Sequence, residues 1–213
     1  MATKLIYFVR HGETENNANN IRQGAEGALT EKGREQAFAA AKRFPKHKGC
    51  PQAIVSSPYE RTKETAEIIS KELKMPVEYS DLLVERKNPT GIIGRWGGER
   101  DVRQIIDRID KSYHADNLRV ADEENFIDLK KRAKKLLAYI TRRPEERIIM
   151  VTHGIFLKMV VSYMLYGDSL TASQYNNLSY FNPINNAGMA IASYKSHWFK
   201  KDEWKLIVWN DLN

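Results

Sequence analysis

The chain has 213 residues, of which 42% are hydrophobic and 29% charged, with 12 glycines and 7 prolines. This composition is typical of a folded globular protein and excludes a fibrous repeat or a disordered chain, while the length favours one domain. The formal net charge of +7 at pH 7 favours anionic ligands near the surface.

Several classes of protein are disfavoured by local sequence. No window approaches the roughly 18 unbroken apolar residues of a membrane span, and the first apolar run is too short for a secretory signal. The single cysteine, Cys50, cannot form an internal disulfide or a thiolate zinc site. We therefore expect a cytoplasmic protein with no membrane partner.

The basic run at 130–135 lies within a helical pattern and has no base-stacking aromatic motif beside it. We interpret it as the solvated face of a helix and expect no nucleic-acid partner. Strong, salt-dependent binding to oligonucleotides would reverse that interpretation.

The first half of the chain alternates predicted strands and helices. Apolar runs predict strands over 4–9, 53–56 and 77–79. Thr30 is the expected N-cap of a helix that extends to about 44, and Pro45 marks its end. A second helix is expected from Ser57-Pro58 to about 74.

The second half continues the alternation after an irregular segment. Residues 81–98 contain Pro89 and four glycines, and we expect an inserted lid around 81–120. The remaining predicted elements are helices over 99–113, 123–142 and 155–166 and strands over 147–151, 189–194 and 204–209. The order predicts a single domain over 1–213, a three-layer α/β/α fold with a mainly parallel central sheet.

Three of the predicted strands run directly into polar residues. They deliver Arg10-His11-Gly12, Ser56-Ser57-Pro58 with Arg61 shortly after, and His153-Gly154. In open parallel sheets ligands bind outside the carboxyl ends of the strands. Guanidinium groups match phosphate oxygens, and Gly12 and Gly154 are expected to let backbone N–H groups approach an anion. A phosphate-transfer pocket is therefore predicted at this edge of the sheet.

Four motifs, taken in order, resemble the histidine phosphatase, or phosphoglycerate mutase-like, superfamily. They are Arg10-His11-Gly12-Glu13-Thr14, Leu29-Thr30-Glu31-Lys32-Gly33, the stretch from Ser56 to Ala66, and Val151-Thr152-His153-Gly154. The resemblance covers most of the chain and implies a phosphoglycerate mutase-like fold.

The resemblance also implies roles for individual residues. His11 would attack phosphorus, while Arg10, Arg61 and His153 would hold the phosphoryl oxygens. The family match for the acid that protonates the leaving oxygen is Glu85. Asn17 lies where such enzymes often place a further phosphate ligand. Two of these assignments have alternatives, since Glu85 could pair with Arg86 or Lys87 on the surface and Asn17 could be an ordinary loop residue.

Imidazole chemistry is consistent with these roles. A neutral imidazole is nucleophilic near neutral pH, so His11 needs orientation through its other ring nitrogen rather than an adjacent base. Positive charge around the transferred phosphoryl group supplies most of the stabilisation. We therefore expect a phosphatase that acts on a small phosphomonoester through a phosphohistidine, with no metal and no cofactor.

Three other functions fit the sequence less well. The acid-phosphatase branch is disfavoured because Gly154-Ile155, and not an aspartate, follows His153. Phosphoglycerate mutases usually carry a His-Tyr-Gly-Gly stretch after Glu-Arg and a later arginine pair before Ser-Tyr. Here Lys87-Asn88-Pro89 follows Glu85-Arg86, and Lys111-Ser112-Tyr113 lacks the pair. A non-catalytic phospho-ligand-binding member is disfavoured by the presence of His11 and Glu85.

The irregular segment suggests a specificity element. Between residues 86 and 100, basic and aromatic side chains lie among glycines; they are Arg86, Lys87, Arg95, Trp96 and Arg100. We expect this segment to serve as a flexible lid whose charge favours acidic substrates. Glu99 is the second candidate for the catalytic acid.

Overall fold

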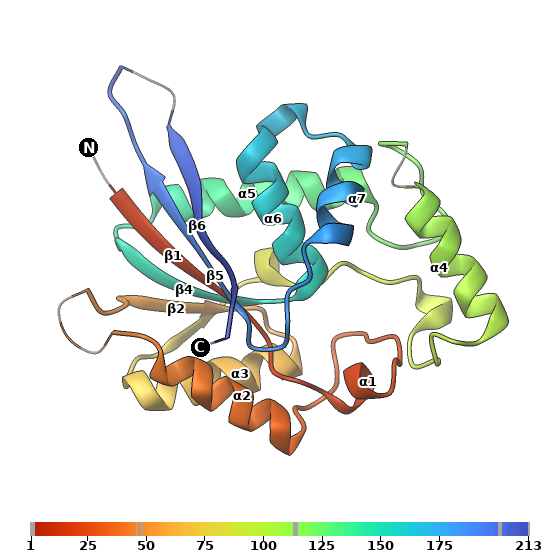
Figure 1. The fold of residues 1–213 in the computed structure, drawn as a ribbon, viewed down its shortest axis with the longest axis horizontal. Coiled ribbons are helices and arrows are strands. Elements are labelled where there is room, and N and C mark those ends of the chain that lie inside the picture. Colours follow the sequence, from red (N-terminus) through yellow and green to blue (C-terminus); the bar gives the residue numbers. More distant parts are fainter. Residues whose placement is uncertain (1–2, 46, 48, 113–114, 200–201, 213) are drawn as a thin grey trace.

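The computed structural model describes residues 3–45, 47, 49–112, 115–199 and 202–212 (Figure 1). The strands are β1 (Thr3–Arg10), β2 (Ala53–Ser56), β3 (Val77–Tyr79), β4 (Arg147–Thr152), β5 (Met189–Lys195) and β6 (Glu203–Asp211). The α-helices are α1 (Glu15–Ala18), α2 (Glu31–Lys42), α3 (Glu60–Leu73), α4 (Arg100–Ser112), α5 (Phe126–Arg142), α6 (Gly154–Tyr166) and α7 (Ala172–Phe181). Tyr113, where the helix predicted over 99–113 was expected to end, lies outside the described residues.

The strands form one sheet in the order β3-β2-β4-β1-β5-β6. β1, β2, β3 and β4 pair in parallel, whereas β5 is antiparallel to both of its neighbours, β1 and β6. The prediction of a mainly parallel sheet is confirmed. Because β2, β4 and β1 are adjacent and parallel, their carboxyl ends meet at one edge of the sheet.

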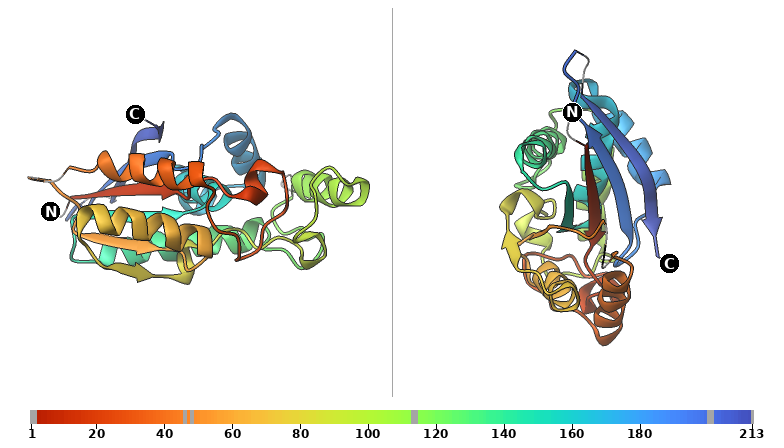
Figure 2. Two further views of the ribbon diagram at one scale, coloured as in Figure 1. Left: turned by 90° about the horizontal axis from the view of Figure 1, so that it is seen from below. Right: turned by 90° about the vertical axis from the view of Figure 1, so that its left-hand side faces the viewer.

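Helices cover both faces of this sheet, as predicted for a three-layer fold. On one face Val9, Ile54 and Val151 pack against residues of α2 and α3, including Ala41 and Ala66. Figure 2 (left) looks onto this face. On the other face, the side chains that alternate with them along the strands pack against α5 and α6; this second cluster includes Ile6, Phe8, Ile148, Met150, Leu136 and Phe156.

Local signals explain most helix boundaries. Thr30 caps α2 as predicted, and its side chain accepts a hydrogen bond from the Gly33 N–H. α3 begins at Glu60, two residues after the expected proline, and ends at Leu73, before Lys74, which adopts a left-handed φ of 54°. α5 begins later than predicted, because Asn125 and Asp128 form a capping box that fixes its first turn.

Two helices were not predicted from the sequence. α1 has only four residues in the Asn-rich loop, and α7 is a polar helix with a weak apolar face. The signal for α7 was its capping box, in which Thr171 and Gln174 satisfy each other's backbone N–H groups.

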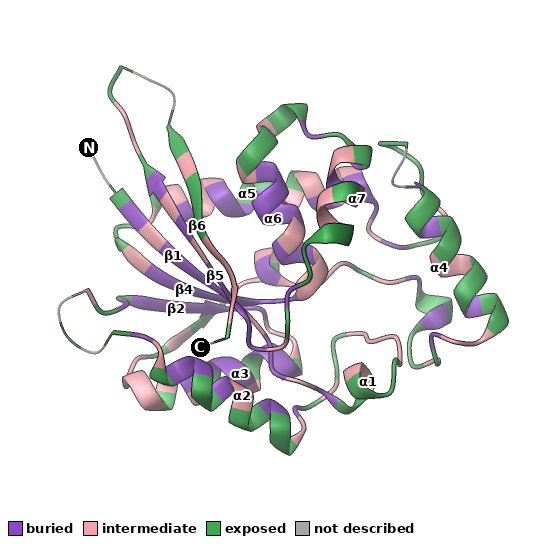
Figure 3. Cartoon of the chain, viewed as in Figure 1, coloured by how far each residue is buried: buried purple, intermediate pink, exposed green. Residues whose placement is uncertain are grey.

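The lid predicted around 81–120 contains two 3-10 turns, Asp81–Leu83 and Thr90–Ile92, followed by α4. Most of α4 is exposed, in contrast to α6, which is buried over most of its length (Figure 3). Among the described residues, no helix has the length and apolar character needed to cross a membrane. The cytoplasmic location stays a prediction.

Candidate active site

The carboxyl ends of β1, β2 and β4 border a pocket of about 280 Å³. Its lining includes six of the seven residues that the sequence nominated: Arg10, His11, Asn17, Arg61, Glu85 and Gly154. The seventh, His153, is fully buried beside it, and its ring centroid lies 5.2 Å from that of His11. Residues from five separate segments of the chain are thus brought together.

His11 follows β1 and is held in a single orientation. Its Nδ1 lies 2.7 Å from the carbonyl oxygen of Gly12, which can only accept, so Nδ1 carries the proton and Nε2 holds the lone pair in the neutral ring. Burial, reinforced by the charges of Arg61 and Arg10, lowers the pKa of His11 well below its ordinary value of 6.5. The imidazole is therefore neutral at pH 7.

Two arginines supply positive charge to the pocket. Arg10 donates from Nη1 to the carbonyl of Ile184 at 2.6 Å, and Arg61 donates from Nη1 to the carbonyl of Gly24 at 2.9 Å. In both side chains the Nε atom is buried without a hydrogen-bond partner. Burial lowers the pKa of Arg61 to about 10, so its guanidinium stays charged at neutral pH. Each side chain therefore retains a buried donor beside His11.

His153 lies just before α6 and is tied to the end of β2. Its Nε2 is 2.9 Å from Ser57 Oγ, while its Nδ1 is buried without a partner. Burial and the nearby Arg61 lower its pKa well below 6.5, so this ring is also neutral. If the Ser57 hydroxyl donates to Nε2, then Nδ1 carries a proton, since a neutral imidazole has one N–H.

Glu85 is positioned at the amino end of α6. Its carboxylate accepts hydrogen bonds from the N–H groups of Ile155 at 3.1 Å, Phe156 at 2.9 Å and Arg86 at 2.8 Å. Glu85 lines the pocket, and Lys87, one of its two alternative partners, pairs with Asp122 instead. The other acid considered, Glu99, instead accepts from Arg95 and from the Trp96 N–H.

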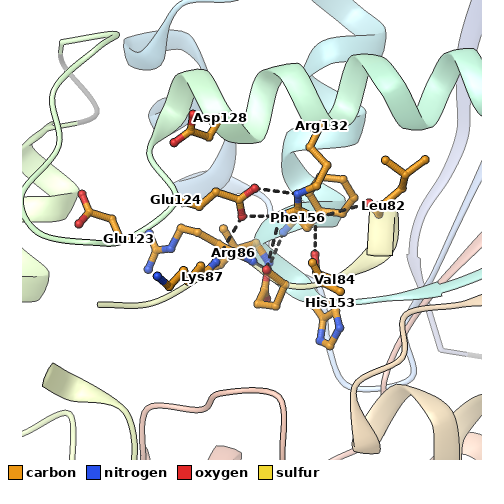
Figure 4. A network of polar contacts seen from close by, with 12 residues as sticks. Leu82, Val84, Arg86, Lys87, Glu123, Glu124, Asp128, Arg132, His153 and Phe156 are labelled. Atoms are coloured by element: carbon orange, nitrogen blue, oxygen red, sulfur yellow. Dashed lines mark hydrogen bonds and ion pairs between the residues drawn. The ribbon is translucent and has the colours of Figure 1, made fainter. Parts of the chain in front are cut away.

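A second arginine network holds the backbone that carries Glu85 (Figure 4). Arg132 of α5 donates to the carbonyl of Val84 at 2.5 Å and makes two bonds to Glu124, at 2.7 and 2.5 Å. Its guanidinium also lies 3.9 Å from the centre of the Phe156 ring. Only 12% of the Arg132 side chain is exposed, and its contacts join α5, α6 and the Glu85 segment.

Asn17 of α1 also faces the pocket. Its Oδ1 accepts a hydrogen bond from Asn186 Nδ2 at 3.3 Å, and Asn186 in turn donates to the carbonyl of His11 at 3.2 Å. The side chain is therefore linked to the loop before β5.

Comparison with known proteins shows the family. The model of the histidine phosphatase superfamily, branch 1, matches residues 6–211. The chain belongs to this family. The family predicted from the four motifs is confirmed, and with it the prediction of an enzyme that processes phosphomonoesters.

Individual relatives agree with this placement. The chain is 31% identical to the probable phosphoglycerate mutase GpmB of Salmonella arizonae, over 75% of this chain and 74% of that protein. It resembles the solved structure of a mycobacterial glucosyl-3-phosphoglycerate phosphatase with VO3 at 25% identity and a TM-score of 0.78, over 97% and 98% of the two chains. A putative alpha-ribazole-5'-P phosphatase from Escherichia coli K-12 shares the fold, with a TM-score of 0.78 at 20% identity over 100% and 98%.

The two motif glycines of this histidine phosphatase allow close packing, and for Gly12 this role differs from the one expected. A Cβ on Gly12 would lie 2.3 Å from the carbonyl oxygen of Gly33, and the Gly12 N–H donates to Thr65 Oγ1 at 3.1 Å. The expectation that this N–H faces an anion is therefore wrong, because close packing between the first two motifs requires the glycine. Gly154 leaves space for Arg10, whose Nε would lie 3.4 Å from an added Cβ.

Sequence reasoning missed several residues of the pocket. They are Ile21, Arg22, Gln23, Asn88, Ile155, Lys158 and Ile184. Lys158 lies one turn into α6, where its Nζ donates to the carbonyl of Ser179 at 2.7 Å. The available signal was its position on the helix that follows His153, about one turn beyond Gly154.

Two basic side chains of the predicted lid, Lys87 and Arg95, have partners outside the pocket. Lys87 pairs with Asp122 at 3.1 Å, and Arg95 pairs with both Glu99 and Asp101. Arg100 and Trp96 are exposed, and neither lines the pocket. The lid segment contributes Asn88 directly, and its backbone positions Arg22.

Among the described residues, no group of three or more histidine, cysteine, aspartate and glutamate side chains is placed to hold a metal ion.

Proposed function

We propose that this protein is a phosphatase that hydrolyses a small phosphomonoester through a phosphohistidine on His11. The observation that carries the proposal is a neutral histidine, oriented through Nδ1, beside two buried arginine Nε donors. A phosphoryl group entering the pocket would give those donors acceptors, and buried donors are costly when they remain unpaired.

In the first step the Nε2 lone pair of His11 attacks phosphorus, and an N–P bond forms as the bond to the leaving oxygen breaks. Glu85 gives its proton to that oxygen, so the alcohol departs neutral. Arg10, Arg61 and His153 donate to the phosphoryl oxygens, where negative charge is spread in the transition state. Asn17 and Gly154 line the same space and complete the proposed binding set.

In the second step water replaces the alcohol. Glu85, now a carboxylate, takes a proton from a water molecule whose oxygen attacks phosphorus, and the N–P bond breaks. His11 returns to its neutral form, inorganic phosphate leaves, and Glu85 again holds a proton. Protons and charges balance over the cycle without a metal or cofactor.

The size of the pocket supports a small substrate. About 280 Å³ lies just below the usual range for drug-sized ligands, roughly 300–1,000 Å³. The contacts of the basic run at 130–135 support the expectation of no nucleic-acid partner. In this run, Lys130, Arg132 and Lys134 bond to neighbouring groups of the protein.

Phosphatase action is favoured over mutase action although the GpmB relative is named a probable mutase. A mutase must keep the phosphoenzyme from water and rebind its product in a second orientation. The sequence lacks the arginine pair that the mutase pattern carries before Ser-Tyr. Hydrolysis of the phosphohistidine should therefore exceed transfer to a second hydroxyl.

Two assays with chelator present test the proposal. Steady release of phosphate from small phosphomonoesters is expected, whereas none from any substrate would overturn it. In the second assay, 3-phosphoglycerate is given with a trace of 2,3-bisphosphoglycerate. Conversion to 2-phosphoglycerate much faster than phosphate release would establish the mutase instead.

A further inference from the structure

The pocket wall formed by residues 21–23 is held in place by the lid segment. The Arg22 N–H donates to the carbonyl of Arg95 at 3.0 Å, and the Arg22 carbonyl accepts from the Gly94 N–H at 2.8 Å. A third bond joins the Gly97 N–H to the carbonyl of Asn20 at 2.8 Å. The backbone of Arg22 is thus fixed on both sides, which directs its side chain into the pocket lining.

The Arg22 side chain is only weakly hydrogen-bonded within the protein. Its Nε is buried without a hydrogen-bond partner, and its bond to Asn20 Oδ1 is long, at 3.4 Å. A guanidinium has five N–H donors and cannot give up its charge near neutral pH. An anionic ligand would therefore give the buried Nε the acceptor that it lacks.

Arg22 also stands apart from the phosphoryl-binding group. The charges that act on the pKa of His11 are those of Arg61 and Arg10. The charged groups that act on Arg22 are Arg86 and Asp110, which belong to the lid side of the molecule. Arg22 lies on the loop that the lid backbone holds, whereas Arg10 ends β1 and Arg61 belongs to α3, so Arg22 is placed to contact a different part of the substrate from the phosphoryl group.

We propose that Arg22 is a specificity-determining residue that binds a second anionic group, a carboxylate or a second phosphate, on the substrate. This inference rests on the proposed function and narrows its substrate to acidic phosphomonoesters. The lid then acts through its backbone, because it holds Arg22, while Lys87 and Arg95 pair with carboxylates.

Gly97 provides a second way to disturb the proposed contact between Arg22 and the substrate. A Cβ at this position would lie 2.8 Å from Arg22 Nη2 and 2.9 Å from Asn20 Oδ1. Both are ends of flexible side chains that can move without changing the backbone. Gly97→Ala should therefore displace the guanidinium while leaving Arg22 in the sequence.

The test compares O-phosphoserine with O-phosphoethanolamine, which differ only by a carboxylate, in the full-length enzyme. Wild type should have the higher kcat/KM for phosphoserine. Arg22→Gln should lower the ratio of the two kcat/KM values at least about tenfold, as expected for a lost hydrogen bond to a charged group. Gly97→Ala should lower it in the same direction, and Arg100→Gln, which removes one exposed lid charge, should leave it unchanged.

Two results would overturn the inference: no preference for phosphoserine in the wild type, or an unchanged ratio of the two kcat/KM values in Arg22→Gln, including the case in which both values fall equally. The proposed function is tested separately with p-nitrophenyl phosphate. If the enzyme hydrolyses p-nitrophenyl phosphate, phosphoserine and phosphoethanolamine but does not prefer phosphoserine, the proposed phosphatase activity holds and the proposed role of Arg22 is wrong. No turnover of any of the three would overturn the phosphatase itself and the inference with it.

Discussion

Replacing Arg132 by methionine tests how far α5 controls the segment that carries Glu85. Methionine keeps an apolar chain on the Phe156 ring, so the change removes mainly polar contacts. The carbonyl of Val84 loses its donor at 2.5 Å, which costs about 1–3 kcal/mol if the carbonyl stays unpaired. Glu124, whose side chain is 19% exposed, also loses its cationic partner.

The expected loss of stability follows from that partial exposure. Breaking a fully buried ion pair costs about 3–5 kcal/mol, and water can still reach Glu124, so the total should be about 2–4 kcal/mol. For a chain of 213 residues this lowers the melting temperature by roughly 5–15 °C. Lys134→Met, on the same helix, is the matched control. Its pair with Asp168 is 59% and 71% exposed and should contribute less than about 1 kcal/mol.

The same variant has a kinetic signature. If Arg132 positions Glu85 through the backbone, kcat should fall more for an alkyl phosphate than for p-nitrophenyl phosphate, whose leaving group needs no proton. Calorimetry and steady-state kinetics below the melting temperature measure both effects. A loss of stability with unchanged kinetics would make Arg132 purely structural, and unchanged stability would refute the energetic reasoning.

Three further predictions concern the pocket. Glu85→Gln should reduce turnover of alkyl phosphates far more than that of p-nitrophenyl phosphate, and equal losses would assign the acid elsewhere. Arg61→Lys should lower kcat/KM roughly 100-fold because lysine cannot reproduce the guanidinium fork, and near-normal kinetics would place Arg61 outside the reaction. The lowered pKa values of His11 and His153 make stability pH-dependent: both rings are neutral in the folded protein, whereas the unfolded chain takes up protons below about pH 6.5. The contribution of the two neutral rings to the free energy of unfolding is therefore fully present above that pH. As the pH is lowered toward the pKa of the folded state, it falls by about 1.4 kcal/mol per histidine per pH unit. Urea unfolding at pH 7.5 and 5.5 measures how much unfolding free energy is lost between the two pH values. The part of this loss that comes from the two histidines should be halved in His11→Ala, and an equal loss in the wild type and the variant would contradict a lowered pKa for His11.

The parts of the fold that could be predicted have local causes. The strands β1, β2 and β4 are apolar runs that end in polar residues, and their parallel pairing follows from the helices between them. The same pattern brings Arg10, Arg61 and the two histidines to one edge of the sheet. Their ordered motifs made the family recognisable.

The parts that could not be predicted depend on tertiary contacts. Sequence spacing alone does not reveal that Arg95 bonds to Glu99 and Asp101. The expectation that Arg95 favours acidic substrates therefore overlooks its pairing within the protein. Likewise, Arg22 is ordinary in sequence and enters the pocket only because lid residues bond to its backbone. Gly12 was assigned to anion binding because its close neighbour, Gly33, lies 21 positions further along the chain.

The most direct test of the central claim is to trap the phosphoenzyme. Brief reaction with a labelled phosphomonoester in chelator, followed by quenching in alkali, should leave acid-labile phosphate on the wild-type protein, and peptide mapping should assign it to His11. His47→Ala, which changes an exposed histidine, should label normally, and His11→Ala should carry no label. Steady hydrolysis without a labelled enzyme, or equal labelling of His11→Ala, would contradict the phosphohistidine mechanism.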